Sequence, residues 1–309
     1  VLRATLYELS LELSVFVGPF VVGETRHGDL RLRTYFPAGM ESLGERYRQQ
    51  VAHYIDAFSA WIGPYPHGEF HVVASPLAVG LGFATLTYVS QRILPLAFMQ
   101  ERSLAHEVLH AWWGHGVQVD YGRGNWSEAL TTFMADYALA ETTSEDAARD
   151  MRRRWLADYA VLSPDQDRPL AAFVARQHTA SQVIGYNKGA MLFLMLRDEI
   201  GFPAFAAGIR RLWRDHQFQS ASWDDLRAAF AAEAGRPLDV FFHQWLARAG
   251  APMLTLAAAG RLDGDRVAFT LTQAGLANGA PYALAVPLSI ETRRGSERHV
   301  VWLNGVSAT

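Results

Sequence analysis

The sequence predicts an α+β fold, in which a β-rich beginning and a β-rich end flank a mostly helical middle. Residues 1–36 contain stretches in which apolar and polar side chains alternate, as they do in half-buried strands. From residue 41 to residue 248, apolar residues recur mainly at helical spacing. After Gly250, Ala251 and Pro252 the period returns to two. The 309 residues, half of them hydrophobic, suffice for one large domain or two modest ones.

The expected elements follow in chain order. Two or three strands are expected within residues 1–36, and then a helix over 41–62, which Gly63 and Pro64 stop. A short strand is predicted at 70–74, and a strand at 81–90 precedes a predicted helix over 100–113. Further helices are expected at 126–139, 144–162, 190–200, 203–216, 223–234 and 238–248. Four strands are expected at 254–256, 267–271, 284–291 and 299–303.

These patterns predict three units along the chain. Residues 1–28 are expected to be strands forming the tail of an N-terminal β domain. Residues 29–250 form the main unit, and residues 251–309 form a small β-sandwich-like segment, because the hydrophobic period changes near residue 250. The chain begins at Val1 rather than Met, so further domains upstream or downstream are compatible with the sequence.

Composition limits the classes of partner. The net charge is −3, from 28 basic and 31 acidic residues, so no global field favours nucleic acid or an anionic membrane. The chain has no cysteine, which excludes disulfides and thiolate metal sites. Its longest apolar candidate, 190–196, is far shorter than the roughly 18 residues that a membrane span needs. The compartment is left undecided by these observations.

The segment from His106 to His110 carries the strongest chemical signal. Residues four apart share a face of a helix, so both imidazoles can bind one Zn²⁺, with Glu107 poised over the open position of the metal. Glu128, at the head of the next predicted helix, can swing back toward this site. The five-residue pattern arises by chance in roughly one chain in a hundred. Burying its polar groups without a partner would be costly, so a zinc site is predicted.

Three longer motifs carry a family resemblance. They are HEVLHAWWG, NWSEALTTFMADY and IGYNKGAMLFLMLRDEIG, and the run SWDDL…FFHQWLARAGAP is also similar. With them, the chain resembles the aminopeptidase N and leukotriene hydrolase family of gluzincin metallopeptidases over roughly residues 15–255. The resemblance implies a thermolysin-like catalytic domain in residues 29–250, with a small sheet and a mostly helical lobe, and it implies a peptide as substrate.

The same resemblance implies the role of each site residue. His106, His110 and Glu128 would hold one zinc ion, and Glu107 would be the general base. Tyr186 would donate a hydrogen bond to the developing oxyanion. On this reading the chain is a zinc-dependent peptidase that acts through a metal-activated water.

Two departures from the family pattern bear on these expectations. The family usually has eighteen residues between the second histidine and the ligand glutamate, whereas positions 111–127 make seventeen. Glu128 as a helix-start residue and Asp120 as the ligand therefore stay as alternatives. The family's Gly-x-Met-Glu-Asn stretch supplies a glutamate that grips a free amine, but Gly80–Tyr88 contains no carboxylate, and none occurs between Glu69 and Glu101.

Other interpretations concern specificity and class. The chain is either an endopeptidase, or an exopeptidase with an amine anchor elsewhere, or a catalytically silent binding or scaffold module on a peptidase fold. The epoxide-hydrolase activity found in the family needs a lipid tunnel, and no sequence pattern reveals one. Asp136 is a candidate to orient a ligand histidine, and His115 is either a residue lining the cleft or a surface residue. The run Arg152–Arg154 is expected to be a solvated helix face.

Overall fold

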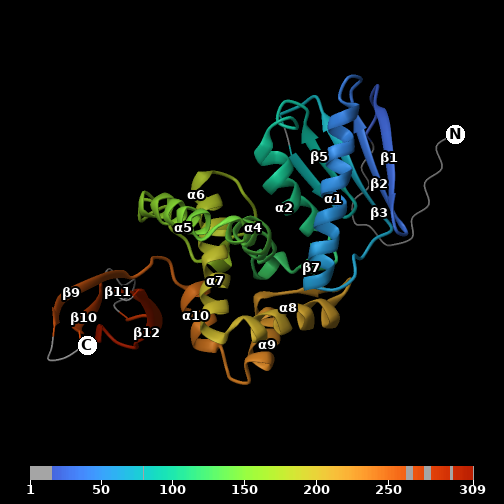
Figure 1. Cartoon of the computed structure of the whole chain (residues 1–309). Coiled ribbons are helices and arrows are strands. Elements are labelled where there is room, and N and C mark those ends of the chain that lie inside the picture. Colours follow the sequence, from blue (N-terminus) through green and yellow to red (C-terminus); the bar gives the residue numbers. More distant parts are fainter. Residues whose placement is uncertain (1–15, 79, 262–266, 275–279, 293–294, 309) are drawn as a thin grey trace.

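The structure is a computed structural model, which describes residues 16–78, 80–261, 267–274, 280–292 and 295–308. Figure 1 shows a sheet lobe at one end, a group of helices in the middle, and a second β region at the other end. The mixture of helices and strands fits the predicted α+β class. Any strand within residues 1–15 lies outside the described residues, so the assignment of 1–28 to a separate β domain stays a prediction.

The first lobe is a mixed five-stranded sheet in the order β1-β2-β3-β5-β4. The strands β2, β3 and β5 run parallel, and β1 and β4 pair antiparallel at the two edges. The predicted boundary at residue 28 falls in the turn of the β1–β2 hairpin, so residues 21–27 belong to the same sheet as residues 30–36. The bounds are Val21–His27 for β1, Leu30–Phe36 for β2, Glu69–Ser75 for β3, Gly80–Phe83 for β4 and Leu86–Ser90 for β5.

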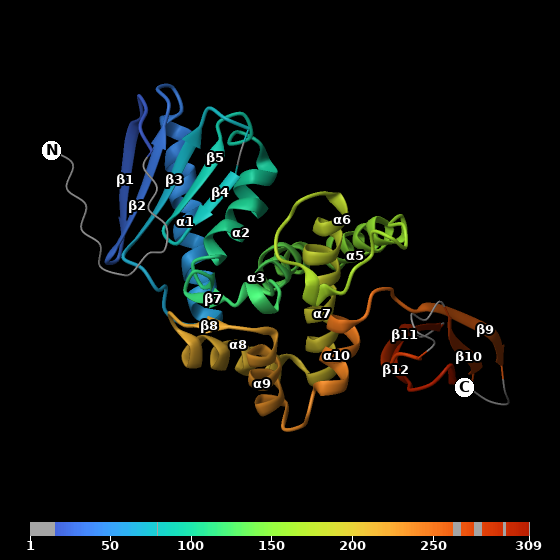
Figure 2. The ribbon, with the colours of Figure 1, turned by 180° about the vertical axis from the view of Figure 1, so that it is seen from behind.

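One expectation for this sheet is wrong. Residues 81–90 were expected as one strand, but they form the hairpin of β4 and β5, which turns at Ala84 and Thr85. The sequence lacks the glycine or asparagine that usually marks such a turn. The hairpin makes β4 the outermost strand, and Figure 2 shows it at the border of the sheet beside α2 (Leu104–Leu109).

The helix α1 (Glu41–Trp61) covers one face of this sheet (Figure 1). Apart from Gly44, its buried residues are those that the helical period singled out: Leu43, Tyr47, Val51, Tyr54, Ile55 and Phe58. Two of them also hold the segment that leads into α2. The Tyr47 hydroxyl donates to the carbonyl of Leu94 at 2.9 Å, and the Tyr54 hydroxyl donates to that of Glu101 at 2.6 Å. The predicted helix over 41–62 is confirmed and anchors the start of the next one.

The middle of the chain is helical, as expected, and three of its helices contain π-helical stretches. These are η1 (Met99–Ser103) before α2, η3 (Thr132–Tyr137) after α3, and η5 (Val183–Lys188) before α7. The α-helices are α3 (Ser127–Thr131), α4 (Ala138–Thr143), α5 (Glu145–Ala160), α6 (Thr179–Gln182), α7 (Gly189–Ile200), α8 (Phe202–His216), α9 (Trp223–Ala234) and α10 (Asp239–Ala247). No helix among the described residues combines the length and the apolar character of a membrane span.

The four strands expected after residue 250 are present, and all four are longer than predicted. They form a sheet in the order β13-β10-β9 and a separate hairpin of β11 and β12. Three very short strands of the helical part, β6, β7 and β8, carry no recognisable sequence signal. The bounds are Trp113–Gly114 for β6, Val117–Val119 for β7, Ser220–Ala221 for β8, Met253–Arg261 for β9, Val267–Ala274 for β10, Leu284–Thr292 for β11, Gly295–Leu303 for β12 and Ser307–Ala308 for β13.

Candidate metal centre

The helix α2 and the residue that caps its end place two histidines at the edge of the core. Its apolar residues Leu104, Val108 and Leu109 are fully buried, which fixes the rotation of the helix. His106 and His110 lie at the margin of this buried face and are partly exposed. The helix ends at Leu109, earlier than the predicted residue 113, because the chain turns there into β6.

The second element of the site is α3, which begins just before Glu128. The Asn125 side chain accepts a hydrogen bond from the backbone N–H of Ser127 at 3.0 Å and so caps the start of the helix. The Ser127 hydroxyl donates to the carbonyl of Trp113 at 2.7 Å, and this bond connects α3 to the segment that follows His110. The connection from α2 to α3, which contains Gly114, Gly116, Gly122 and Gly124, therefore ends with Glu128 facing α2.

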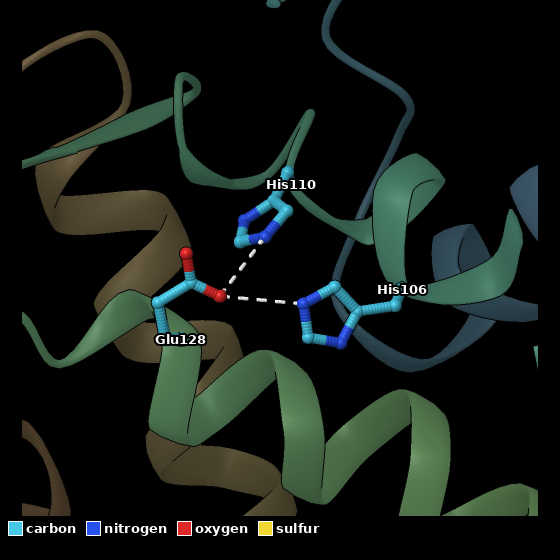
Figure 3. Close-up of side chains that lie close together, drawn as sticks. All are labelled: His106, His110 and Glu128. Carbon is cyan, nitrogen blue, oxygen red and sulfur yellow. Dashed lines mark hydrogen bonds and ion pairs between the residues drawn. The ribbon is translucent and has the colours of Figure 1, made fainter. Parts of the chain in front are cut away.

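These elements bring two imidazoles and a carboxylate together (Figure 3). The Oε2 atom of Glu128 lies 3.3 Å from Nε2 of His106 and 3.4 Å from Nε2 of His110. The three candidate ligand atoms all lie within 4.8 Å of one another. Donor atoms at about 2.0–2.1 Å from a tetrahedral Zn²⁺ are separated by about 3.3–3.4 Å. The donor set and its spacing therefore fit zinc.

Each histidine is oriented by a bond to its other ring nitrogen. Nδ1 of His106 lies 2.8 Å from Oδ2 of Asp136, and Nδ1 of His110 lies 2.9 Å from the carbonyl of Trp113. A proton on each Nδ1 satisfies these acceptors and leaves the lone pair of Nε2 for a metal. Asp136, which was expected to orient a ligand histidine, lies in η3 and contacts His106.

The three groups perturb one another's protonation. Burial alone would raise the pKa of Glu128, but the neighbouring imidazoles outweigh it and hold this pKa well below its usual value. Burial would lower the pKa of His106, but the carboxylates of Asp136 and Glu128 raise it well above its usual value. A half-buried carboxylate that keeps its negative charge is suited to hold a cation.

Glu107 lies one position after the first histidine and is half-buried. Its carboxylate faces the edge strand β4, since a Cβ atom added to Gly82 would lie 3.1 Å from Oε2 of Glu107. Glycine at position 82 therefore lets the β4 backbone approach this carboxylate closely. No motif in the sequence marks Gly82 as part of the site.

Tyr186 approaches the same site from η5. Its ring stacks against that of His106, with centroids 6.1 Å apart and planes 13° apart, and meets Phe173 edge-on at 5.9 Å. Burial, together with the charge of Glu128, raises the pKa of the Tyr186 phenol well above its usual value. The phenol keeps its proton at neutral pH and can donate a hydrogen bond.

Two further candidates lie outside the ligand group. Asp120 caps the short 3₁₀ turn η2 (Tyr121–Arg123), where its Oδ1 atom accepts from the N–H of Gly122 at 3.1 Å. His115 is half-buried, and burial lowers its pKa to about 4, so it is neutral at physiological pH.

A close helix contact sets the distance between the Glu128 and Tyr186 segments. A Cβ atom on Gly189 would lie only 2.4 Å from Cβ of Ala129, the residue after Glu128. We expect Gly189→Ala to lower the free energy of unfolding by about 1–3 kcal/mol, because the helices must separate. Denaturant unfolding measures this loss. The control Gly68→Ala adds a methyl group where no atom lies within 4 Å, and equal losses in the two variants would contradict the contact.

Comparisons with known proteins show which family this chain resembles. Residues 99–245 match the model of the peptidase family M1 domain. The tricorn protease-interacting factor F2 of Thermoplasma volcanium is 25% identical over 306 residues, which cover 92% of this chain and 38% of that protein. The mitochondrial aminopeptidase 2 of Saccharomyces cerevisiae is 23% identical over 282 residues, which cover 80% of this chain and 30% of that protein.

A relative from a plant shows a similar identity and coverage. Aminopeptidase M1 of Arabidopsis thaliana is 22% identical over 285 residues, which cover 82% of this chain and 32% of that protein. The chain thus spans about a third of the length of the curated relatives it matches. The resemblance drawn from the sequence motifs is confirmed: over residues 99–245 the chain is similar to the domain of peptidase family M1, and aminopeptidases are among its curated relatives.

Proposed function

We propose that this chain is a zinc-dependent peptidase with a thermolysin-like catalytic domain. The observation that carries the proposal is the convergence of His106, His110 and Glu128, with Glu107 and Tyr186 beside them. A scaffold protein has no use for an additional carboxylate and a protonated phenol at such a site. The proposed ligands are the two histidines and Glu128, and the proposed catalytic residues are Glu107 and Tyr186.

Zinc held by these three ligands would lower the pKa of water to about 7 and polarise a carbonyl. Glu107 accepts the proton of the attacking water and delivers it to the leaving nitrogen. Tyr186 donates a hydrogen bond to the oxygen on which negative charge develops, and the loss of one such donor typically costs about 3 kcal/mol. Asp136 and the carbonyl of Trp113 hold the imidazoles in the orientation that this chemistry needs.

The edge strand β4 supports an extended peptide as the substrate. Among the described residues β4 pairs only with β5, so its outer edge has backbone groups that can bind another strand. Gly82 of β4 lies against Glu107, which would place a bound strand beside the general base. This strand bears no acidic side chain that could bind a free α-amine.

We therefore propose that hydrolysis does not require a free amino terminus. Matched peptides with free and N-acetylated ends are expected to be cleaved with kcat/KM values within about tenfold of each other, since no local anion offsets desolvation of the amine. The assay uses the full chain with zinc, and a chelator should abolish cleavage until zinc is restored.

The outcomes separate the alternatives. Cleavage of free peptides alone would overturn the amine-independent specificity and leave the hydrolase intact, as would be the case for an exopeptidase with its anchor elsewhere. Bound zinc with no turnover of any peptide would contradict the enzymatic proposal and support a binding module.

A further inference from the structure

Lys188 is the single lysine of the chain, since the other 27 of the 28 basic residues are arginines. Its side chain lies largely out of solvent, with 9% exposed. An ammonium group is a compact charge with three donors, and its burial needs several acceptors. The surroundings of Lys188 supply them.

The ammonium group binds the end of the α10 segment. Nζ of Lys188 lies 3.1 Å from the carbonyl of Gly250 and 3.5 Å from that of Arg248. It also lies 3.9 Å from Oδ1 of Asp167 and 5.3 Å from the ring centroid of Tyr159. Burial lowers the pKa of Lys188, and the Asp167 charge opposes this shift.

Asp167 completes a closed network around this cation. Its Oδ2 atom accepts from the Tyr159 hydroxyl and from the N–H of Gly250, each at 2.6 Å. The hydroxyl of Tyr282, in the C-terminal β region, donates to the carbonyl of Gly250 at 3.3 Å. Lys188 thus connects η5 to the loop after α5 and to the point where the chain enters the C-terminal strands.

The same short helix carries Tyr186, two residues earlier. The Tyr186 ring lies against His106, while the Lys188 ammonium reaches the junction at Gly250. The Phe173 ring packs directly against this helix at Gly185, where an added Cβ atom would lie 2.3 Å from the ring. Packing and a charged anchor together therefore fix the place of η5.

We propose that Lys188 is a positioning residue, which holds η5 through the carbonyls of Arg248 and Gly250 so that the Tyr186 hydroxyl meets the developing oxyanion. This inference rests on the proposed function. A donor stabilises an oxyanion only at about 2.7–3.1 Å, and a 1 Å misplacement can cost about a hundredfold in rate. The C-terminal β region acts on the reaction through this anchor.

The test compares three single variants of the full chain. Lys188→Met removes the charge and the donors at similar length and is expected to lower kcat about tenfold with KM nearly unchanged, because Tyr186 acts in the transition state. Lys188→Arg keeps donors and charge and should recover most of kcat. The control Asn187→Ala removes an exposed bond of the same helix, 3.1 Å from Nδ2 of Asn187 to Oδ2 of Asp158, and should stay within twofold.

A double-variant cycle separates positioning from simple destabilisation. In the Tyr186→Phe background, Lys188→Met should cause no further loss of kcat, since the group that Lys188 positions is already absent. Zinc content and the thermal midpoint are measured for every variant. An equal loss with and without the Tyr186 hydroxyl, or a rise in KM alone, overturns the inference. A Tyr186→Phe variant with full kcat would instead contradict the proposed role of Tyr186.

Discussion

Replacing Glu107 with glutamine is expected to leave zinc bound while peptide cleavage falls by about 10²–10⁴-fold. Glutamine keeps the shape of the side chain but cannot accept the proton of the attacking water. Because Glu107 is not one of the three residues in the ligand group, the metal content should stay at that of the unmodified protein. Metal analysis and steady-state kinetics on one peptide measure both quantities.

A matched control lies in the preceding π-helical stretch. Glu101 is exposed, and in the structure its backbone carbonyl, not its carboxylate, accepts the bond from Tyr54. Glu101→Gln should therefore cleave at the unmodified rate. If Glu107→Gln also cleaves at that rate, Glu107 is not the base.

Replacing Glu128 with alanine is expected to abolish zinc binding and hydrolysis together. The carboxylate lies between both imidazoles, so its removal leaves only two imidazole ligands for the cation. Zinc at about 1,000 times its dissociation constant stabilises a folded protein by about 4 kcal/mol. We expect this zinc-dependent rise in the thermal midpoint for the unmodified chain and not for Glu128→Ala.

The alternative ligand named from the sequence supplies the control. Asp120 caps a surface turn, so Asp120→Ala should keep zinc, its stabilising effect and catalysis. Loss of zinc from Asp120→Ala with retention in Glu128→Ala would reverse the assignment of the third ligand. Isothermal titration of the metal-free proteins with zinc gives the affinities directly.

The metal group could be predicted from the sequence because its chemistry is local. His106 and His110 share a helix face through their spacing alone, and the helical period of α1 gave its buried face residue by residue. Glu128 could be predicted as the third ligand because it lies at the start of the next expected helix, from which its side chain can reach back to the histidines. Asp136 was recognisable as a carboxylate two turns further on, and it contacts His106.

Features that depend on distant partners could not be predicted in this way. The turn at Ala84 and Thr85 lacks turn-forming residues, so the β4–β5 hairpin follows from pairing with β3 rather than from local preference. The approach of Gly82 to Glu107 joins two segments about 25 residues apart. The partners of Lys188 lie about 20 and 60 residues away, and one lysine in a sequence gives no sign of its burial.

The three π-helical stretches have a consequence for the phase of the helices that carry the site. A π turn takes in an extra residue relative to an α turn, and one residue corresponds to about 100° of rotation. The apolar stripes before and after η3 and η5 are therefore offset, which lets Asp136 and Tyr186 turn inward while the flanking turns keep their own contacts. A gain or loss of one residue in such a stretch would rotate the following part of the helix. It would thereby change the direction of a site side chain without changing the length of any loop.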